Sequence, residues 1–390
     1  MRWKTMDKLI EQFEVTLERL KTYLPERKRP FYKSIQIDDV RGALIYGLRG
    51  VGKTTFLINK IANSKRNFLY FSADHPLISS LPLYEIVSEI FKKGYEGVVI
   101  DEIHHANKWS EHIKAIYDDY PDKTIWISDS SNLILRKSVS DLSRRFVQFR
   151  IPLMSFREYI FLTQGILVDP VDPFNIDKNI FVILKDINIL KLFSDYINGG
   201  IRPIFTEGEY CSRLKGLLEK SIYYDIPFYV SSIQDKHLRV MNAIIGYLIT
   251  SAIPTINISG MCNEWDLGKE KLYNLLYVME HSELINIVKK PGKFTYTKGA
   301  KIFLSDPSMY GCFKGNPGSA REAFAVMCLK EKYEVFACKD DRDCDFIVDG
   351  IKIEVGGKRK KSKNADFTIS DDIDIPVRNR IPLWILGFLY

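Results

Sequence analysis

The sequence predicts an α/β fold, with a parallel sheet near the N-terminus and a mainly helical continuation that ends in a smaller α/β module. Over the first 150 residues short apolar runs alternate with helical patterns, whereas helical spacing dominates from residue 156 to about 229. The chain has 390 residues, which is more than one hydrophobic core usually supports. We therefore expect several domains.

The first domain is predicted from four apolar runs that are typical of buried strands. Helical patterns separate these runs, and strands that alternate with helices of that length indicate parallel βαβ units. The strands are expected at residues 43–47, 67–73, 97–102 and 124–130, and the helices at Thr54–Ser64, Leu83–Lys93 and Ser110–Tyr120. An amphipathic helix over residues 1–24 and a basic stretch precede them.

Composition places the chain among ordinary globular proteins. Hydrophobic residues make up 46% of it and charged residues 27%, which excludes the disordered and fibrous classes. The 56 basic and 49 acidic residues give a net charge of +7, and the basic excess is concentrated in residues 286–301 and 351–363. Such segments suit a polyanion, although a solvated surface remains the alternative.

Cysteine usage and hydropathy indicate a cytoplasmic protein without a membrane partner. The six cysteines form no CxxC pair and have no histidine at zinc-ligand spacing, which predicts reduced thiols that pack in the interior. No segment approaches the roughly 20 apolar residues that span a bilayer. The N-terminal segment also lacks the apolar stretch of a signal peptide.

A phosphate-binding loop connects the first predicted strand to the first predicted helix of the sheet. The sequence GLRGVGKT fits G-x-x-x-x-G-K-[ST] at every fixed position. In this motif backbone N–H groups wrap around phosphates, the lysine reaches the terminal phosphates and the threonine ligates Mg²⁺. The predicted cofactors are ATP and Mg²⁺. The predicted nucleotide-binding residues are Gly47, Leu48, Arg49, Gly50, Val51, Gly52, Lys53, Thr54 and Thr55.

Two carboxylates end the third predicted strand, at the edge of the sheet where open α/β folds place their ligands. We predict that Asp101 holds Mg²⁺ together with Thr54, and that Glu102 polarises the attacking water. His104 and His105 follow directly. Side chains at adjacent positions point in different directions, so a metal-binding histidine pair is not expected.

Further catalytic candidates follow the fourth predicted strand. A hydroxyl of the polar run 128–131 is expected to sense the γ-phosphate, with Ser130 as the candidate and an ordinary Asp/Ser turn as the alternative. Arg145 is the candidate arginine finger that reaches the nucleotide of a neighbouring subunit, which predicts an oligomer. Ordinary surface arginines at 144 and 145 remain the other interpretation.

Residues 235–304 follow the order of a winged helix-turn-helix. Helices are expected at Leu238–Ser251, Ile258–Glu264 and Lys269–His281, with two β-like segments around a Pro-Gly turn after them. In this fold the last helix reads bases and the wing contacts phosphates, whereas a protein-packing module is the alternative. The predicted DNA-binding residues are Lys269, Lys271, Asn274, Lys289, Lys290 and Lys293.

Five segments in this order together resemble a family of prokaryotic AAA-type P-loop ATPases: GLRGVGKTT, FLYFSADH, VVIDEIHHANKW, IWISDSSNLIL and IPLMSFREYI. The resemblance implies the same roles for Lys53 and the two carboxylates as the motifs do. It also places Ser130 in the sensor strand and Arg145 before a characteristic Pro-Leu-Ser-Phe-x-Glu-Tyr stretch. In that family a winged helix precedes a nuclease-like last module.

The resemblance implies that residues 316–390 form a module of the PD-(D/E)xK nuclease type. In such enzymes acids on a helix and a hairpin hold Mg²⁺ beside the scissile phosphate. The matching acids are Glu322, Asp345 and Glu354. The lysine normally found two residues after the second acid is absent here because the position holds glycine, and Lys358 is the nearest candidate. Active cleavage and an inactive scaffold that grips nucleic acid both stay open.

These observations together predict an ATPase that couples Mg-ATP binding and hydrolysis to action on DNA. One alternative is an ATP-licensed, Mg²⁺-dependent DNA nuclease, and another is a nucleotide-dependent signalling or defence scaffold without DNA chemistry. The expected segments are 1–34 (N-terminal helix and basic leader), 35–155 (P-loop core), 156–234 (helical lid), 235–315 (winged helix) and 316–390 (nuclease-like module).

Overall fold

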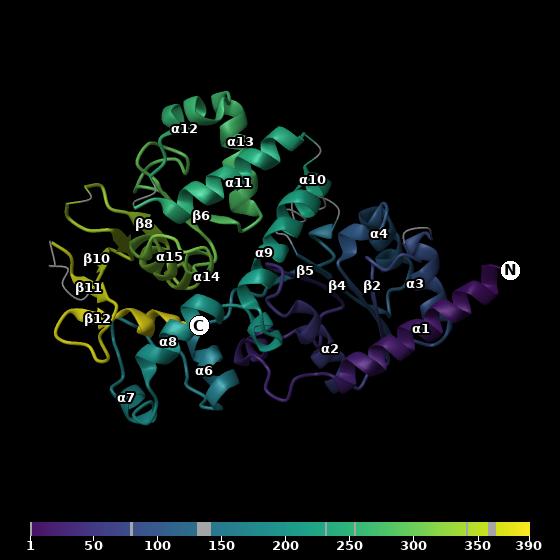
Figure 1. Ribbon diagram of the computed structural model, residues 1–390. Helices are drawn as coiled ribbons and strands as arrows, with labels where there is room; N and C mark the ends of the chain where they lie inside the picture. Colours follow the sequence, from purple (N-terminus) through teal and green to yellow (C-terminus); the bar gives the residue numbers. More distant parts are fainter. Residues whose placement is uncertain are drawn as a thin grey trace. The chain divides into compact units, whose positions relative to one another are not determined.

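The computed structural model describes residues 2–78, 81–130, 142–230, 232–252, 255–340, 342–357 and 364–390. The chain divides into two compact units, Met1–Pro152 and Leu153–Tyr390, drawn in Figure 1. The finer division into five segments stays a prediction. Within the described ranges no helix combines the length and the hydropathy that are needed to cross a bilayer.

The first unit contains a five-stranded parallel sheet with the strand order β2-β3-β4-β1-β5. Its strands are β1 (Gly42–Tyr46), β2 (Phe68–Ser72), β3 (Gly97–Asp101), β4 (Thr124–Asp129) and β5 (Val147–Arg150). The four strands that apolar runs predict are confirmed. The apolar pattern does not predict β5, because its sequence VQFR is half polar and its side chains stay partly exposed.

Helices connect these strands at the predicted positions. They are α2 (Lys53–Asn63), α3 (Leu83–Lys92) and α4 (Trp109–Asp119). The N-terminal helix α1 (Arg2–Thr22) packs against β2, where the ring of Phe13 stacks on that of Phe71 at 4.9 Å. Its buried residues recur every three or four positions, so one face of α1 belongs to the core of the first unit.

The second unit begins with helices, as the spacing from residue 156 predicts. They are α6 (Phe156–Gln164), α7 (Asn179–Ile183), α8 (Ile189–Gly199), the 3₁₀ segment η3 (Pro203–Glu207), α9 (Tyr210–Lys220), the π-helical segment η4 (Ser221–Asp225) and α10 (Ile226–Tyr229). Helix α6 begins at a capping box, in which the side chain of Ser155 and that of Glu158 satisfy each other's backbone N–H groups.

Three helices and an antiparallel hairpin follow, in the order expected for a winged helix. The helices are α11 (Asp235–Thr250), α12 (Ile258–Trp265) and α13 (Lys269–His281). The hairpin consists of β6 (Ile285–Val288) and β7 (Lys301–Leu304), which pair as a separate two-stranded sheet. The predicted helices and the two β segments therefore occur where the sequence places them.

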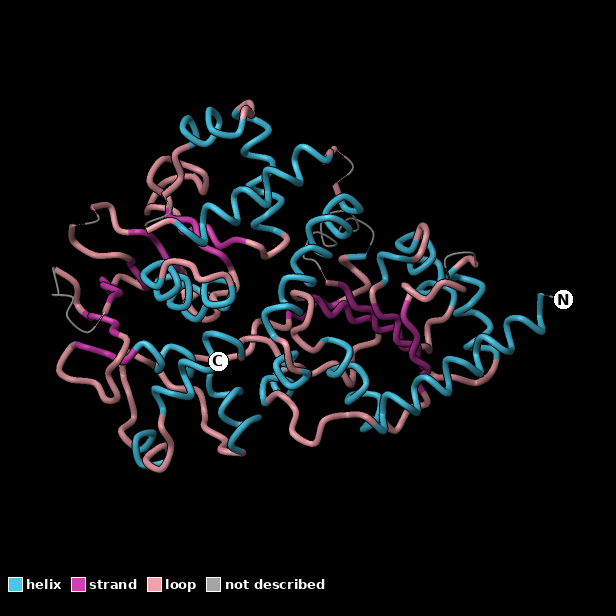
Figure 2. Tube along the Cα trace, viewed as in Figure 1, coloured by secondary structure: helices cyan, strands magenta, loops and turns pink. Residues whose placement is uncertain are grey.

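The last part of the chain forms a second five-stranded sheet, of order β12-β11-β10-β9-β8 (Figure 2). Its elements are α14 (Ser308–Cys312), α15 (Pro317–Leu329), β8 (Val335–Ala337), β9 (Phe346–Val348), β10 (Ile351–Gly356), β11 (Phe367–Ser370), β12 (Arg380–Pro382) and the 3₁₀ segment η5 (Leu383–Phe388). Strands β8, β9 and β10 form an antiparallel meander, and β11 and β12 continue parallel to β10.

An aromatic cluster joins the first helices of the second unit to this last module. Phe156 of α6 meets Phe388 of η5 edge to face at 5.7 Å between ring centroids, and Phe193 of α8 meets Phe324 of α15 at 5.1 Å. Each such pair adds about 0.5–1.5 kcal/mol beyond area burial. The helical segment and the last module therefore share one core.

Disulfide bonds in the second unit correct the expectation of reduced thiols. Cys211 of α9 is bonded to Cys312 of α14 across a sequence separation of 101, and Cys338 is bonded to Cys344. Spacing along the chain gives no sign of the first pair, because only the packing of α9 beside α14 brings the two sulfurs together.

We predict that Cys211→Ser lowers the midpoint of thermal unfolding in non-reducing buffer, because a cross-link of this kind stabilises a fold by about 2–4 kcal/mol. Cys262→Ser is the control, since Cys262 is a free thiol. Dithiothreitol is expected to remove the difference between wild type and Cys211→Ser. Equal midpoints for these two proteins in non-reducing buffer would contradict the prediction.

Candidate functional site

The loop between β1 and α2 has a backbone that glycine adopts and other residues resist. The φ angles of Gly47, Gly50 and Gly52 are 150°, 78° and 95°. A Cβ on Gly47 would lie 2.3 Å from the carbonyl oxygen of Ile151, so a side chain has no room there. The loop leads into the N-terminus of α2, where free N–H groups and the helix dipole favour phosphate.

Lys53, the first residue of α2, turns its side chain back over this loop. Its Nζ donates hydrogen bonds to the carbonyl oxygens of Gly47, at 2.8 Å, and of Leu48, at 3.1 Å. Burial lowers the pKa of Lys53, although the nearby carboxylates of Glu102 and Asp101 act in the opposite direction. The ammonium group is therefore held beside the loop that phosphates would enter.

Asp101 ends β3 and accepts hydrogen bonds from three hydroxyl groups. Thr54 Oγ1 and the Tyr70 hydroxyl donate to Asp101 Oδ2 at 2.5 and 2.9 Å, and the Ser128 hydroxyl donates to Oδ1. Carboxylate and hydroxyl oxygens are ligands that Mg²⁺ prefers, so the predicted pair of Thr54 and Asp101 fits this ion. Burial, with Asp101 adding to it, raises the pKa of Tyr70 well above its ordinary value.

Glu102 follows in a left-handed conformation with a φ of 49°, which turns its side chain out of the alternation of the strand. Its Oε1 lies 3.3 Å from Nη1 of Arg49, a loop residue that is itself buried. Burial raises the pKa of Glu102, whereas the charges of Lys53 and Arg49 oppose this shift. The structure thus brings the predicted catalytic carboxylate to the phosphate loop, with an arginine bound to it.

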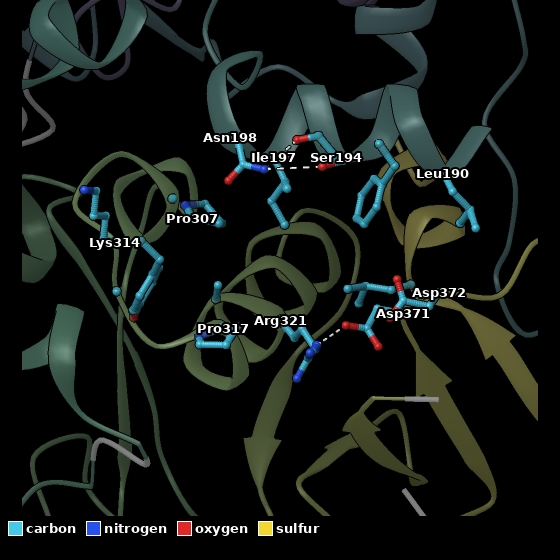
Figure 3. Close-up of a pocket in the computed structure, with 16 residues that line it drawn as sticks. Leu190, Ser194, Ile197, Asn198, Pro307, Lys314, Pro317, Arg321, Asp371 and Asp372 are labelled. Atoms are coloured by element: carbon cyan, nitrogen blue, oxygen red, sulfur yellow. Dashed lines mark hydrogen bonds and ion pairs between the residues drawn. The ribbon is translucent and has the colours of Figure 1, made fainter. Parts of the chain in front are cut away.

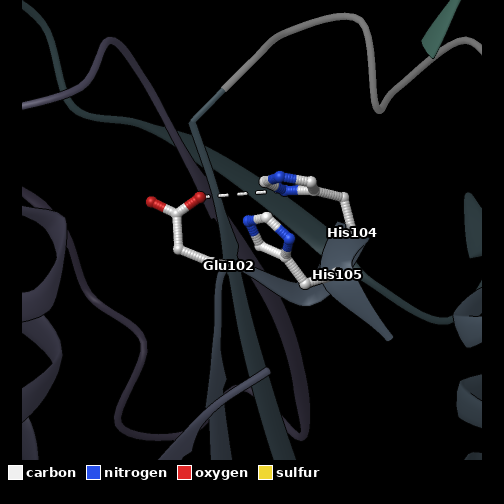
Figure 4. Close-up of side chains that lie close together, drawn as sticks. All are labelled: Glu102, His104 and His105. Carbon is white, nitrogen blue, oxygen red and sulfur yellow. Dashed lines mark ion pairs between the residues drawn. The ribbon is translucent and has the colours of Figure 1, made fainter. Parts of the chain in front are cut away.

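His104 and His105 lie side by side, contrary to the expectation that they point apart. Their ring centroids are 4.1 Å apart because residues 103–105 form a 3₁₀ turn and not an extended strand. Together with Glu102 they offer three ligand atoms within 4.8 Å of one another, a donor set that suits a transition metal (Figure 4). His104 Nδ1 also lies 2.9 Å from Asp129 Oδ2.

Two residues ahead of β1 hold the phosphate loop, and the sequence motifs do not predict them. Nη1 of Arg29 donates to the carbonyl oxygens of Val51 and Pro152, at 2.8 and 2.9 Å. The hydroxyl of Tyr32 donates to the carbonyl oxygen of Gly52 at 2.8 Å. Both belong to the basic stretch that follows the N-terminal helix, and Arg29 is only 3% exposed.

The candidate sensor Ser130 is buried, whereas the candidate finger Arg145 is bonded to a carboxylate on α4. Ser130 is buried directly after β4. Arg145 makes two parallel hydrogen bonds of 2.8 Å to the carboxylate of Asp118 on α4, and these bonds lower the pKa of Asp118. Arg202 is buried in the second unit, where its Nε lies 2.6 Å from Asp306 Oδ2. Arg145 therefore has a partner in its own chain.

The six candidate DNA contacts divide into two groups. Exposed side chains on α13 and at the hairpin tip belong to Lys269, Lys271, Asn274 and Lys293. The other two lysines contact residues that flank β8. Lys289 Nζ lies 3.7 Å from Glu334 Oε1, and Lys290 Nζ donates a hydrogen bond to the carbonyl oxygen of Lys339 at 3.1 Å. The residues of the first group are exposed, whereas Lys289 and Lys290 are partly buried.

The three predicted acids of the last module lie on α15 and on or beside two neighbouring strands of its sheet. Glu322 lies on α15, Asp345 directly precedes β9, and Glu354 is buried in β10. The antiparallel register of β9 and β10 sets Asp345 opposite Glu354, and the backbone N–H of Val355 donates to Asp345 Oδ2 at 2.8 Å. The fourth predicted member, Lys358, lies outside the described residues.

A cavity of about 470 Å³ lies among α8, α14, α15 and the segment after β11 (Figure 3). Its wall includes the ion pair of Arg321 with Asp371, together with Lys314 and Asp372. The volume falls in the range of small-molecule sites. No motif predicts this cavity, because its lining comes from three distant segments of the chain, within residues 190–198, 307–321 and 371–383.

Residues 40–160 match the protein family described as an AAA domain. The matched stretch contains the glycine loop and all five strands of the parallel sheet. An uncharacterised protein of Methanocaldococcus jannaschii is 29% identical to the chain, with the alignment covering 68% of this chain and 62% of the relative. The chain thus spans less than two thirds of that relative's length.

Two solved structures resemble the chain distantly. The Walker-type ATPase of Pyrococcus abyssi aligns over 75% of this chain and 96% of its own, with 12% identity and a TM-score of 0.46. RuvB, the Holliday junction branch migration motor of Thermotoga maritima, aligns over 75% and 91%, with 13% identity and a TM-score of 0.33.

We predict that Arg29→Met lowers the free energy of unfolding of the first unit by about 2–4 kcal/mol, because two buried carbonyl groups lose a charged donor. Urea denaturation followed by tryptophan fluorescence measures this change. The exposed Arg27 provides the matched control variant Arg27→Met. Equal stability of the two variants would contradict a bracing role for Arg29.

Proposed function

We propose that this chain is an AAA-type ATPase that couples Mg-ATP hydrolysis to action on DNA. The observation that carries the proposal is the convergence of Lys53, Thr54, Asp101 and Glu102 on the glycine loop at the carboxyl end of a parallel sheet. This edge is where open α/β sheets bind their ligands. The AAA-domain match of residues 40–160 supports the same conclusion.

In the proposed mechanism the loop N–H groups hold the phosphates, and Lys53 exchanges its two carbonyl partners for phosphate oxygens. Thr54 and Asp101 would hold the Mg²⁺ ion, which supplies charge neutralisation to the phosphates. Glu102 orients and polarises the attacking water. Its burial strengthens this electrostatic role, because the low local dielectric does not screen the carboxylate.

Arg49 and His104 give Glu102 two neighbours that control its position. Arg49 Nη1 lies 3.3 Å from Oε1 of Glu102, and His104 Nδ1 lies 3.7 Å from Oε2. We infer that a bound γ-phosphate competes for Arg49 and releases the carboxylate toward water. The hydrogen bond from His104 Nδ1 to the buried Asp129, at 2.9 Å, fixes the imidazole ring beside Glu102.

Subunit association is the proposed role of Arg145. In this structure its guanidinium is bound to Asp118 in a bidentate pair that is partly exposed to solvent. Exposed pairs of this kind contribute little free energy, so a phosphate group can replace the carboxylate at small cost. We propose that Arg145 makes this exchange when a second subunit presents its nucleotide. Ser130, which follows β4, is the proposed sensor of the γ-phosphate.

DNA binding is the proposed role of the second unit. Lys269, Lys271 and Asn274 present donors from the exposed face of α13, and Lys293 adds a charge at the hairpin tip. A helix with exposed donors beside a basic hairpin suits base edges and phosphates, respectively. The helical segment 156–229 shares a core with the last module, so we propose that it transmits the nucleotide state to these surfaces.

We predict that Glu102→Gln binds ATP with nearly unchanged affinity but lowers turnover about 100-fold or more, because the water loses its base. Lys53→Ala is expected to lose ATP binding itself. Glu111→Gln, an exposed acid on α4, is the control. Calorimetry and phosphate release measure the two properties. Absence of ATP turnover in folded wild-type protein would refute the proposed activity.

We predict that reversing two charges on α13, in Lys269→Glu with Lys271→Glu, weakens duplex DNA binding and reduces the dependence of log affinity on log salt by about two. Fluorescence anisotropy over a salt series measures both effects. Lys215→Glu on α9, also exposed, is the control. An unchanged salt dependence would mean that α13 does not face DNA.

A further inference from the structure

A lysine from the hairpin lies within the acid cluster of the last module. Lys301, the first residue of β7, places Nζ 2.9 Å from Glu322 Oε2 and 3.3 Å from Asp345 Oδ1. The side chain of Lys301 is 3% exposed, and those of Glu322 and Asp345 are 14% and 9% exposed. This ammonium group therefore joins two of the three acids in a site that is closed to solvent.

The position of this ammonium group conflicts with a divalent cation in the same place. Mg²⁺ at such a site would need the carboxylate oxygens of Glu322 and Asp345 as ligands at about 2.0–2.1 Å. Those oxygens already accept hydrogen bonds from Lys301, and Asp345 Oδ2 accepts one from the backbone N–H of Val355. A Mg²⁺ ion on the same two oxygens would lie against the Lys301 ammonium group, and the two like charges would repel each other.

The electrostatics keep Lys301 charged in this environment. Burial alone would lower its pKa, but Glu322 and Asp345 outweigh burial and hold the pKa above its ordinary value. Removing one partner of a buried ion pair leaves an uncompensated charge, which is strongly destabilising. The cluster therefore has a built-in cation that it cannot lose without a replacement.

We propose that Lys301 is the permanent counter-ion of a nuclease-like site, taking the place of a divalent cation, so that this module does not cleave phosphodiester bonds. The inference deepens the proposed function, since it rests on the nuclease-like character of the module. Position 356, at the end of β10, is glycine, and Lys301 of β7 supplies a positive charge to Glu322 and Asp345.

The same contact has a mechanical consequence. Lys301 belongs to the hairpin that completes the three-helix segment, whereas Glu322 and Asp345 belong to the last module. The ion cluster thus fastens the hairpin to the sheet corner, and the hydrogen bond from Ala337 N to Lys289 O, at 2.9 Å, adds a backbone contact nearby. A proposed DNA-binding hairpin and the nuclease-like sheet are therefore held as one body.

The test replaces the ammonium group and asks whether a metal ion takes its place. In full-length Lys301→Met we expect a lower midpoint of thermal unfolding without divalent cations and a clear rise with millimolar Mn²⁺. Wild type and the control Lys298→Met, an exposed lysine of the same hairpin, are expected to show a smaller rise, which comes from metal binding at the nucleotide site. The nucleotide site is identical in all three proteins, so any response of that site cancels.

A second variant removes the acids along with the lysine. Lys301→Met combined with Glu322→Gln and Asp345→Asn is expected to regain stability and to lose the response to Mn²⁺. Plasmid incubated with wild type and Mg²⁺ or Mn²⁺ is expected to stay intact, and this assay needs no variant to fold. Cleavage by wild type that Lys301→Met abolishes would overturn the proposal, because Lys301 would then be a catalytic lysine.

Two further results separate this proposal from the proposed function. The counter-ion role would be refuted if the midpoint of thermal unfolding of Lys301→Met equalled that of wild type and rose no more with Mn²⁺. This conclusion would hold whatever the rate of ATP turnover. Absence of ATP turnover in wild type would refute the ATPase proposal. The Mn²⁺ response of Lys301→Met would still test the counter-ion role of Lys301.

Discussion

The short hydrogen bond between Thr54 and Asp101 is the contact on which the nucleotide site depends. It joins the first turn of α2 to the last residue of β3, two elements 47 positions apart, and it sets the phosphate loop beside the carboxylates. Tyr70 and Ser128 donate to the same carboxylate from β2 and β4. One buried acid therefore aligns three neighbouring strands and a helix end.

The second unit depends on a comparable charged contact. Lys301 is surrounded by carboxylates in a closed corner, just as Lys53 lies beside Asp101 and Glu102 in the first unit. The two lysines differ in their partners. Lys53 bonds neutral carbonyl oxygens that phosphates can displace, whereas Lys301 bonds carboxylates directly, which makes its place permanent.

Much of the first unit follows from local sequence. A buried parallel strand needs an apolar run, and a phosphate loop needs glycines at positions with positive φ, so both leave a pattern along the chain. The roles of Arg29 and Tyr32 leave no pattern along the chain, because a basic stretch has the same composition whether its arginine is solvated or bonded to a distant carbonyl oxygen. The histidine pair was misjudged for a related reason, since alternation applies to a strand and residues 103–105 form a turn.

The sequence by itself determined the phosphate loop, the two carboxylates of β3, the first four strands and the helices and hairpin of residues 235–304, because each depends on residues that are near one another in the chain. Only the tertiary structure decided which distant groups meet: Cys211 with Cys312, Arg49 with Glu102, and Lys301 with Glu322. Such pairs carry no local signal, because the two partners are far apart in the sequence and come together at a place that exists only after folding.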